Sequence, residues 1–200
     1  IVLDWLFHTL LSGAEAGAPI SAEEERAFVR ALAAAATASD PDLLLLPYLT
    51  GERAPLWDVR ASAACVGLRL THTRAHVLRA AVEGILFNAY WIASGLFTTA
   101  GRPRQIIASG KVLEADWIRQ LAADIFGLPV VYRGAVDASV VGAARLAEIA
   151  TGTRTWEDAT RHPASGDEQV MAPADGAPYY YAAKFARFQR LAGLLEGERG

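Results

Sequence analysis

The sequence predicts an α/β domain, a parallel or mixed sheet flanked by helices. Three observations lead to this fold class. Apolar runs of strand length alternate with helical patterns between residues 105 and 150, which is the rhythm of a helix-covered sheet. Glycine and proline follow the predicted helices, as at Gly127 and Pro129. The chain has 200 residues, 52% hydrophobic and 20% charged, which is ordinary for a globular protein with a buried core.

Each element is predicted from local signals. Helices are expected where apolar residues recur at helical spacing after a capping residue, and strands where short apolar runs lie between turn residues. In chain order, the prediction is a helix at 1–11, a helix from Ser21 to before Asp40, strands at 43–49 and 65–70, a helix from Thr71 or Thr73 to before Gly101, a strand at 105–109, a helix at 114–126, a strand at 130–132, and helices at 138–150 and 179–195. Residues 50–64 are expected as a loop and 153–178 as a polar surface excursion.

Two predicted helices carry specific signals. Ser21 and Glu24 have the spacing of a capping box, in which each side chain accepts a hydrogen bond from the other residue's backbone N–H. Gly84 and Gly95 interrupt the long helix, and each weakens it by roughly 1 kcal/mol relative to alanine. A break inside that helix is therefore left open.

Composition gives no support for several partner classes. The formal net charge of −3 gives no electrostatic reason to expect nucleic acid or an anionic membrane. Residues 85–97 form the most apolar window, which is shorter than the roughly twenty residues that a membrane span needs. Cys65 is the single cysteine, which favours a reducing, cytoplasmic setting.

The chain opens on Ile1 inside a helical pattern, so we expect either a processed chain or a fragment of a longer protein.

A row of polar residues follows the second predicted strand. His72, His76, Arg79 and Glu83 are spaced by four, three and four, which places them on one face of the predicted helix. Two His at this spacing could hold zinc, but no further cluster completes such a site, so no metal ligands are assigned. The favoured interpretation is a polar stripe that hydrogen-bonds to the preceding loop.

The loop sequence GERAPLWD allows two interpretations. Arg53 and Trp57 could present a cation and a ring to a ligand. The favoured alternative is an internal brace, in which Glu52 or Asp58 pairs with Arg53 and Trp57 fills the core.

Two turns follow the neighbouring strands at 105–109 and 130–132. Ser109, Gly110 and Lys111 come directly after the first strand, and Asp137 follows the second, where it would most simply cap the next helix. In an open α/β sheet, ligands bind at the carboxyl ends of the strands, so a nucleotide cleft is plausible here. The sequence has no P-loop, Rossmann fingerprint or nucleophile elbow.

The segments PYLTGERAPLWD and GLRLTHTRAHVLRAAVEG resemble the C-terminal half of the FGGY carbohydrate kinases, which include gluconate, xylulose, ribulose and glycerol kinases. Further on, ASGKVLEADWIRQLAADIFGLPV resembles that family's adenosine-binding segment, and VDASVVGAARLAEIATG the helix that follows it. The resemblance covers residues 43–152. Cys65 stands where the family pattern has a larger apolar residue.

The resemblance implies an actin-like, ribonuclease-H-like ATPase domain. Residues 1–152 would form the nucleotide-binding second domain of a two-domain kinase, without its first strands, and residues 153–200 would complete it with a surface excursion and a C-terminal helix. The catalytic aspartate and most of the sugar site would lie in the absent first domain, so no catalytic residue is assigned. The implied cofactors are ATP and Mg²⁺, and the implied nucleotide contacts are Ser109, Gly110, Lys111, Ala115 and Asp137.

Two departures affect those contacts. Lys111 stands where the family commonly has a second glycine, and its side chain would either obstruct a phosphate or bind it. Ala115 stands where glycerol kinases have an asparagine beside adenine. The GERAPLWD form favours a gluconate or xylulose kinase over a glycerol kinase.

The predicted activity is phosphoryl transfer from MgATP to a sugar or sugar acid, with the 200 residues inactive alone. The alternative is a non-catalytic regulatory or dimerisation module derived from half of a kinase. A homodimer is left open in either case.

Overall fold

The computed structural model describes residues 2–6, 8–9, 21–133, 138–160 and 168–197. The chain forms two compact units. The first unit comprises residues 1–102 and 176–200, and the second comprises residues 103–175. Each unit is described by itself below.

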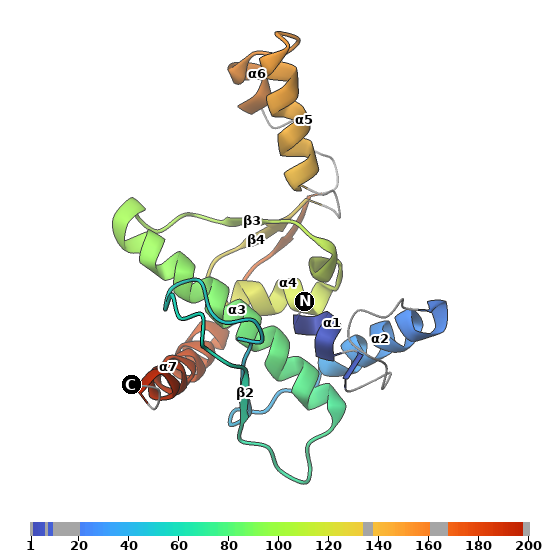
Figure 1. Ribbon diagram of the computed structural model, residues 1–200, viewed down its shortest axis with the longest axis vertical. Helices are drawn as coiled ribbons and strands as arrows, with labels where there is room; N and C mark the ends of the chain where they lie inside the picture. The colour runs from blue at the N-terminus through green and yellow to red at the C-terminus, as the bar shows by residue number, and fades with distance from the viewer. Residues whose placement is uncertain (1, 7, 10–20, 134–137, 161–167, 198–200) are drawn as a thin grey trace. The chain divides into compact units, whose positions relative to one another are not determined.

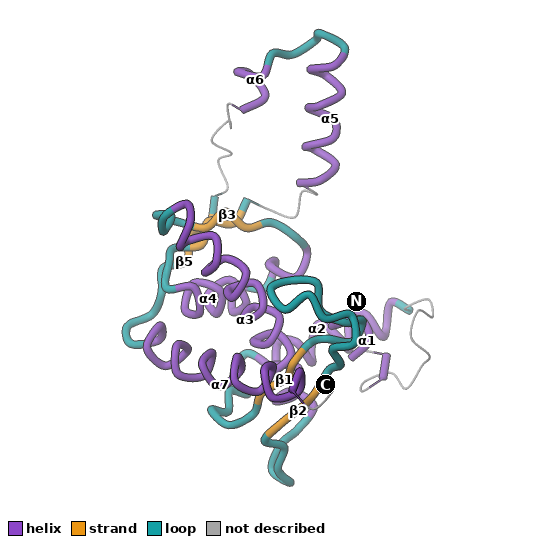
Figure 2. The backbone as a smooth tube through the Cα atoms, turned by 60° about the vertical axis from the view of Figure 1, so that its left-hand side comes forward, coloured by secondary structure: helices purple, strands orange, loops and turns teal. Residues whose placement is uncertain are grey.

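The first unit is mainly helical, with one short pair of strands. Its elements are α1 (Val2–Leu6), α2 (Ala22–Ala35), β1 (Leu44–Leu46), β2 (Ala64–Val66), α3 (Arg74–Ala100) and α7 (Ala177–Gly197). Strand β1 pairs with β2 in antiparallel register, with Leu45 opposite Cys65. All three residues of β1 are buried, because α3 and α7 both pack against this strand (Figures 1 and 2).

Capping signals start the two long N-terminal helices where the sequence predicts. The Ser21 hydroxyl accepts a hydrogen bond from the Glu24 N–H at 3.2 Å, and the Glu24 carboxylate accepts one from the Ser21 N–H at 2.8 Å. This confirms the predicted capping box. Thr73 is the N-cap residue of α3, and Gly101 ends that helix at a φ of 84°.

The two glycines within α3 have different surroundings. A Cβ atom on Gly84 would lie 2.1 Å from the carbonyl oxygen of Leu45, so the helix approaches β1 too closely for any side chain. A Cβ atom on Gly95 would meet nothing within 4 Å. The helix runs unbroken through both positions, so Gly84 serves the packing of α3 on β1.

Aromatic rings fill the space between α3 and α7. The ring of Phe87 lies 5.5 Å from that of Phe188 and 5.8 Å from that of Phe185, measured between centroids. Phe87 and Phe188 are fully buried. These contacts between residues about 100 positions apart fix the C-terminal helix to the long central one.

The second unit contains a three-stranded mixed sheet. Its elements are β3 (Ile106–Ala108), the 3-10 helix η2 (Lys111–Glu114), α4 (Asp116–Phe126), β4 (Val130–Tyr132), α5 (Ala138–Ala150), α6 (Trp156–Thr160) and β5 (Gln169–Met171). Strand β4 is central, parallel to β3 and antiparallel to β5. Helix α4 packs on this sheet through a buried apolar face (Figure 1). The α/β class and the mixed sheet are thus as predicted.

Three local predictions need correction. Residues 153–178 contain α6 and β5, which the expected surface excursion did not include. Strand β2 ends at Val66 rather than Leu70, because Gly67 takes a φ of 92° and turns the chain. The helix predicted at 114–126 begins two residues later, because Glu114 ends η2 and Ala115 is the N-cap residue of α4, which begins at Asp116. Strand β5 has two exposed residues out of three, so it lacks the apolar run that marks a strand in the sequence.

Among the described residues, α3 is long and apolar enough to cross a membrane by length and composition alone. Its N-terminal half packs inside the first unit, where Arg79 and Glu83 are buried with Leu78 and Val82. These charged residues have partners within the unit, as described below. The buried residues of α3 lie between Leu78 and Phe87, and about a third of its apolar window is buried.

Candidate functional site

The turn after β3 has a backbone geometry that requires glycine. Gly110 has a φ of 120° and a ψ of 154°, a region that residues with a side chain rarely adopt. A Cβ atom there would meet nothing within 4 Å, so the space beside the turn is open. The neighbouring Ser109 is exposed. A ligand could therefore approach this backbone closely.

Helix α4 begins beside this turn without a capping side chain. Its N-cap residue is Ala115, whose carbonyl accepts hydrogen bonds from the N–H groups of Ile118 and Arg119 at 3.0 and 3.3 Å. An alanine offers no side-chain acceptor to the first N–H groups, so the positive end of the helix dipole lacks the usual cap. A phosphate or another anion is the ligand that such a helix end favours.

The parallel pairing of β3 and β4 brings the carboxyl ends of these two strands to one edge of the sheet. Ala108 at the end of β3 lies opposite Tyr132 at the end of β4. The turn from Ser109 to Ala115 and the chain that leaves Tyr132 therefore share the carboxyl edge, where open α/β sheets bind ligands. Lys111 opens η2 in this turn. Asp137 lies outside the described residues.

One buried residue at this edge was missed by the sequence reasoning. Arg119 is 2% exposed, and its guanidinium contacts the turn, β4 and β5. A signal was present, because Arg119 lies three and seven positions before the buried Ala122 and Phe126, on the apolar face of α4. A cation at such a position needs several acceptors around it.

The GERAPLWD loop is braced by Glu52, one of the two residues proposed, but its partners differ from the expected Arg53. The buried Glu52 carboxylate accepts hydrogen bonds from the N–H groups of Ala54 and Leu56, both at 2.8 Å, and from that of Trp57 at 3.2 Å. The expected pairing with Arg53 is not among its contacts, and Arg53 is exposed. The brace is therefore made mainly with backbone groups, and the side-chain amide of Asn88 also donates to Glu52 at 3.4 Å.

Trp57 does not fill the core as proposed. Its side chain is 78% exposed, and its backbone φ of 58° is rare for a bulky residue. The hydrogen bonds of Glu52 hold the turn in which Trp57 lies on the surface. Asp58 caps the end of the loop by accepting a hydrogen bond from the Arg60 N–H at 2.8 Å.

The residues of the predicted polar stripe do not all lie on one helical face, and they make separate hydrogen bonds and an ion pair. Helix α3 begins at Arg74, so His72 precedes it and its imidazole lies 3.2 Å from the Asp40 carboxylate. His76 accepts a hydrogen bond from the Thr73 N–H at 3.2 Å. Arg79 and Glu83 form a buried ion pair at 2.8 Å.

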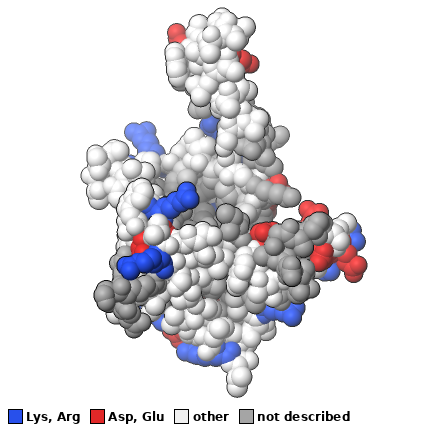
Figure 3. Space-filling view, in the orientation of Figure 1, with Lys and Arg blue, Asp and Glu red and all other residues white. Residues whose placement is uncertain are grey.

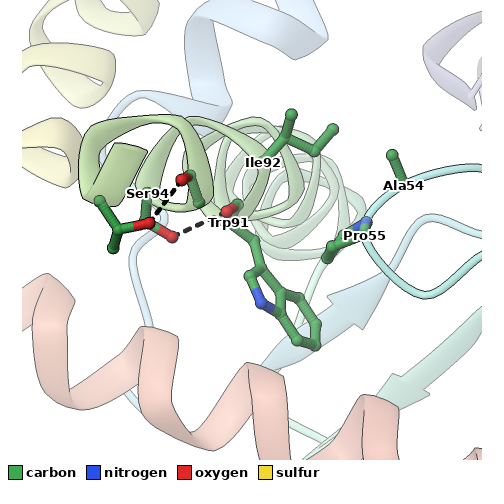
Figure 4. Close-up of a pocket in the computed structure, with 7 residues that line it drawn as sticks. Ala54, Pro55, Trp91, Ile92 and Ser94 are labelled. Carbon is green, nitrogen blue, oxygen red and sulfur yellow. Dashed lines mark hydrogen bonds between the residues drawn. The ribbon is translucent and has the colours of Figure 1, made fainter. Parts of the chain in front are cut away.

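The first unit has a cavity of about 350 Å³ between the GERAPLWD loop and α3. Figure 4 shows Trp91 and Ile92 of α3 opposite Ala54 and Pro55 of the loop. The hydroxyls of Ser94 and Thr98 already donate to helix carbonyls at 2.7 Å. No charged side chain lines this cavity, so it suits a phosphate poorly, and none of the predicted contacts lies in it.

Charge on the visible surface is dispersed. On the face in Figure 3, the described Lys and Arg residues occur in small separate groups, with Asp and Glu between them. Within the described part of the chain, no three His, Cys, Asp or Glu side chains gather as a metal site. Among the features described, the backbone turn at Gly110 and the start of α4 therefore have the geometry that best suits a ligand.

Comparison with known proteins identifies the family. Residues 1–151 match the model of the C-terminal domain of the FGGY family of carbohydrate kinases. A gluconokinase from Bacillus licheniformis is 34% identical over 157 residues, which are 78% of this chain and 30% of that protein.

Two solved structures are similar over nearly all of the chain. The xylulose kinase from Lactobacillus acidophilus has a TM-score of 0.78 and 30% identity, covering 100% of this chain and 39% of its own. The gluconate kinase from the same species has a TM-score of 0.73 and 31% identity, covering 97% and 37%. The chain thus spans between about three tenths and two fifths of the length of these relatives. It belongs to the FGGY family of carbohydrate kinases and has the actin-like ATPase fold of that family.

Proposed function

We propose that this chain is the nucleotide-binding part of an ATP-dependent kinase that phosphorylates a sugar or sugar acid, with gluconate and xylulose as the first candidates. The observation that carries the proposal is the match of residues 1–151 to the C-terminal domain of the carbohydrate kinases. The names of the similar proteins, gluconokinase and xylulose kinase, support the choice of acceptor.

In the proposed reaction, the oxygen of a carbohydrate hydroxyl attacks the γ-phosphorus of ATP. The bond from that phosphorus to the β,γ-bridging oxygen breaks, and ADP leaves with the electron pair. The hydroxyl proton passes to a carboxylate, which the family resemblance assigns to the domain that this chain lacks. Such transfers depend on positioning and on electrostatic stabilisation, with little covalent chemistry for the protein.

We assign the nucleotide contacts to the carboxyl edge of the second unit. The open backbone at Gly110 and the uncapped start of α4 at Ala115 suit the adenosine and phosphate of a nucleotide. Ser109 offers an exposed hydroxyl beside them. Lys111 and Asp137 remain in the proposed set, the first from the same turn and the second from the chain after β4.

Bound Mg²⁺ would supply charge neutralisation on the β- and γ-phosphates. The described residues offer no cluster of three potential metal ligands, so we derive no step through the ion on this part of the chain. We place the reaction in the cytoplasm, where ATP is available, and expect the 200 residues alone to be inactive, because the proton acceptor and the sugar site lie elsewhere.

The first experiment tests activity in the full-length protein that contains this chain. ADP release is measured by a coupled assay with gluconate, xylulose and glycerol, beside the 200-residue chain alone. We expect sugar-dependent release by the full-length protein, strongest with gluconate or xylulose, and none by the chain alone. Release with none of the three acceptors would contradict the proposed substrate class, and release by the chain alone would contradict its dependence on another domain.

The second experiment tests the nucleotide site. ADP binding to the full-length protein is measured by calorimetry for the wild type, Gly110→Trp and Ser109→Trp. Ser109→Trp is included because it leaves the special backbone of Gly110 intact. The control is Leu146→Trp, at a position in α5 that is 55% exposed. We expect about tenfold weaker binding or more for the two turn variants. Equal binding by all four proteins would move the site away from this turn.

A further inference from the structure

Arg119 makes four side-chain hydrogen bonds at the carboxyl edge through its two terminal nitrogens, while its buried Nε has no partner among the described residues. One guanidinium nitrogen donates to the carbonyl oxygens of Leu113 and Glu114, the latter at 2.9 Å. The other donates to the carboxylate of Asp116 and to the side-chain oxygen of Gln169. The guanidinium thus joins the end of η2 and the start of α4 to β5.

Arg119 forms hydrogen bonds with three consecutive carbonyls where η2 meets α4. Its side chain binds those of Leu113 and Glu114, and its own N–H binds that of Ala115 at 3.3 Å. In a trans peptide, the carbonyl and the N–H that follows it point in opposite directions. The N–H groups in these three peptide planes, which belong to residues 114–116, therefore point away from Arg119. Fixing the carbonyls fixes the direction in which the segment presents its donors.

The same side chain reaches the second strand of the edge. The guanidinium carbon lies 4.6 Å from the centroid of the Tyr132 ring, a cation–π contact at the last residue of β4. Tyr132 pairs with Gln169 across the β4–β5 ladder, so both partners of Arg119 belong to one rung of the sheet. Arg119 thus connects the turn after β3 to the end of β4, from which the chain continues to Asp137.

Stability alone gives a weak reason for this arrangement. A buried ionic group contributes little net stability, because desolvation offsets its attraction, and well-packed apolar replacements are often as stable. A guanidinium that holds several acceptors in fixed directions does supply geometric specificity, since its donors form a rigid planar fork.

We propose that Arg119 is a positioning residue for nucleotide binding, which fixes the segment between Gly110 and Asp116 against the carboxyl end of β4. This inference rests on the proposed function, because it assumes that the nucleotide binds at that edge. Arg119 is buried behind the segment and acts through the backbone that it holds. It therefore affects the nucleotide and not the acceptor sugar.

The test uses the full-length kinase and the acceptor sugar that gives the strongest ADP release in the first experiment. The KM for ATP, the KM for the sugar, kcat and the midpoint of thermal unfolding are measured for Arg119→Met and Arg119→Lys. We expect the KM for ATP to rise about tenfold or more in both, since small misplacements of binding groups have effects of this size. The sugar KM is expected to stay within about twofold of the wild type. Lysine retains the charge but cannot span two carbonyls and Gln169, so it should not restore ATP binding.

Two further variants complete the test. Gln169→Leu removes one acceptor and leaves Arg119 in place, so it remains informative if Arg119→Met fails to fold, and it should raise the KM for ATP by a smaller factor. Arg145→Met is the matched control, because Arg145 also binds a backbone carbonyl of the second unit, but that carbonyl belongs to Ala159 in α6 and not to the turn. It should leave the KM for ATP unchanged.

The outcomes separate this inference from the proposed function. An unchanged KM for ATP in Arg119→Lys and Gln169→Leu, with weakened binding in Ser109→Trp, would overturn the role of Arg119 and leave the nucleotide site intact. A lower unfolding midpoint in the Arg119 variants without a selective rise in the KM for ATP would likewise show that Arg119 has only a structural role. Wild-type binding in Ser109→Trp and Gly110→Trp would instead refute the site itself.

Discussion

The ammonium nitrogen of Lys184 in α7 lies 2.5 Å from a carboxylate oxygen of Glu83 in α3, and both side chains are buried. Glu83 also binds Arg79 at 2.8 Å, so one carboxylate holds two cations. Lys184 donates further to the carbonyl of Asp40, and Arg79 to the hydroxyl of Tyr181 at 2.9 Å. This network fixes the C-terminal helix to the long central helix and to the entry of β1.

Removing the shared carboxylate should destabilise the first unit strongly. Glu83→Gln leaves two buried cations without a counter-charge, and breaking such a group typically costs about 3–5 kcal/mol. The free energy of unfolding is measured by urea titration followed through tryptophan fluorescence. The control is Asp42→Asn, whose carboxylate pairs with Arg69 and Arg187 at a largely exposed site, where the expected cost is about 0–1 kcal/mol. Equal losses for the two variants would contradict the importance assigned to the buried network.

Alanine should have opposite effects at the two glycines of α3. Helix propensity alone favours alanine at both positions by about 1 kcal/mol. At Gly84, however, a Cβ atom would lie 2.1 Å from the Leu45 carbonyl oxygen, so α3 and β1 must separate, and overpacking of this kind costs about 1–3 kcal/mol. Gly84→Ala is therefore expected to lower the unfolding free energy, and Gly95→Ala to raise it. Stabilisation by both substitutions would refute the close approach of the helix to β1.

The brace of the GERAPLWD loop should depend on the charge of Glu52. Its carboxylate accepts three backbone hydrogen bonds, and hydrogen bonds to charged groups contribute about 1.5–3 kcal/mol each. Glu52→Gln keeps the shape but replaces one acceptor oxygen with a donor, so we expect a loss of at least about 2 kcal/mol. Arg53→Ala next to it is the control and should change stability by less than about 0.5 kcal/mol, because Arg53 is exposed. Faster proteolysis of the loop in Glu52→Gln alone is an independent measure.

Stability should fall in acid through Asp40. The N–H of Asp42 and the imidazole of His72 bind this carboxylate and lower its pKa from 3.8 to about 2. Because the folded state has the lower pKa, the stabilisation is complete above about pH 4 and disappears as the pH falls towards 2. Urea titrations between pH 2 and 6 should show this loss in the wild type. The Asp40→Asn variant should be less stable at pH 6 and show a smaller loss in acid. Parallel pH curves for the two proteins would exclude the contribution of Asp40.

Much of the fold could be predicted because its signals are local. The capping box at Ser21, the helix that ends at Gly127 and the strand at 130–132 each depend on a few neighbouring residues, and all three occur in the structure. The turn at Gly110 was found in the same way, since a glycine after a short apolar run is visible in the sequence. The polar features were predicted less well. Glu52 could be recognised as part of a loop, but its backbone partners follow from how that loop turns.

Local patterns in the amino-acid sequence are sufficient for the family, the α/β class and the position of the strand-end turn, because motif order, periodicity and glycine placement are properties of neighbouring residues. The tertiary structure alone decided which distant residues meet. It joins Glu83 to Lys184 across 101 positions and Arg119 to Gln169 across 50. It also decided that Gly84 is needed for packing while Gly95 is not. Burial and long-range pairing depend on how elements pack against one another, and no local pattern of residues encodes those distances.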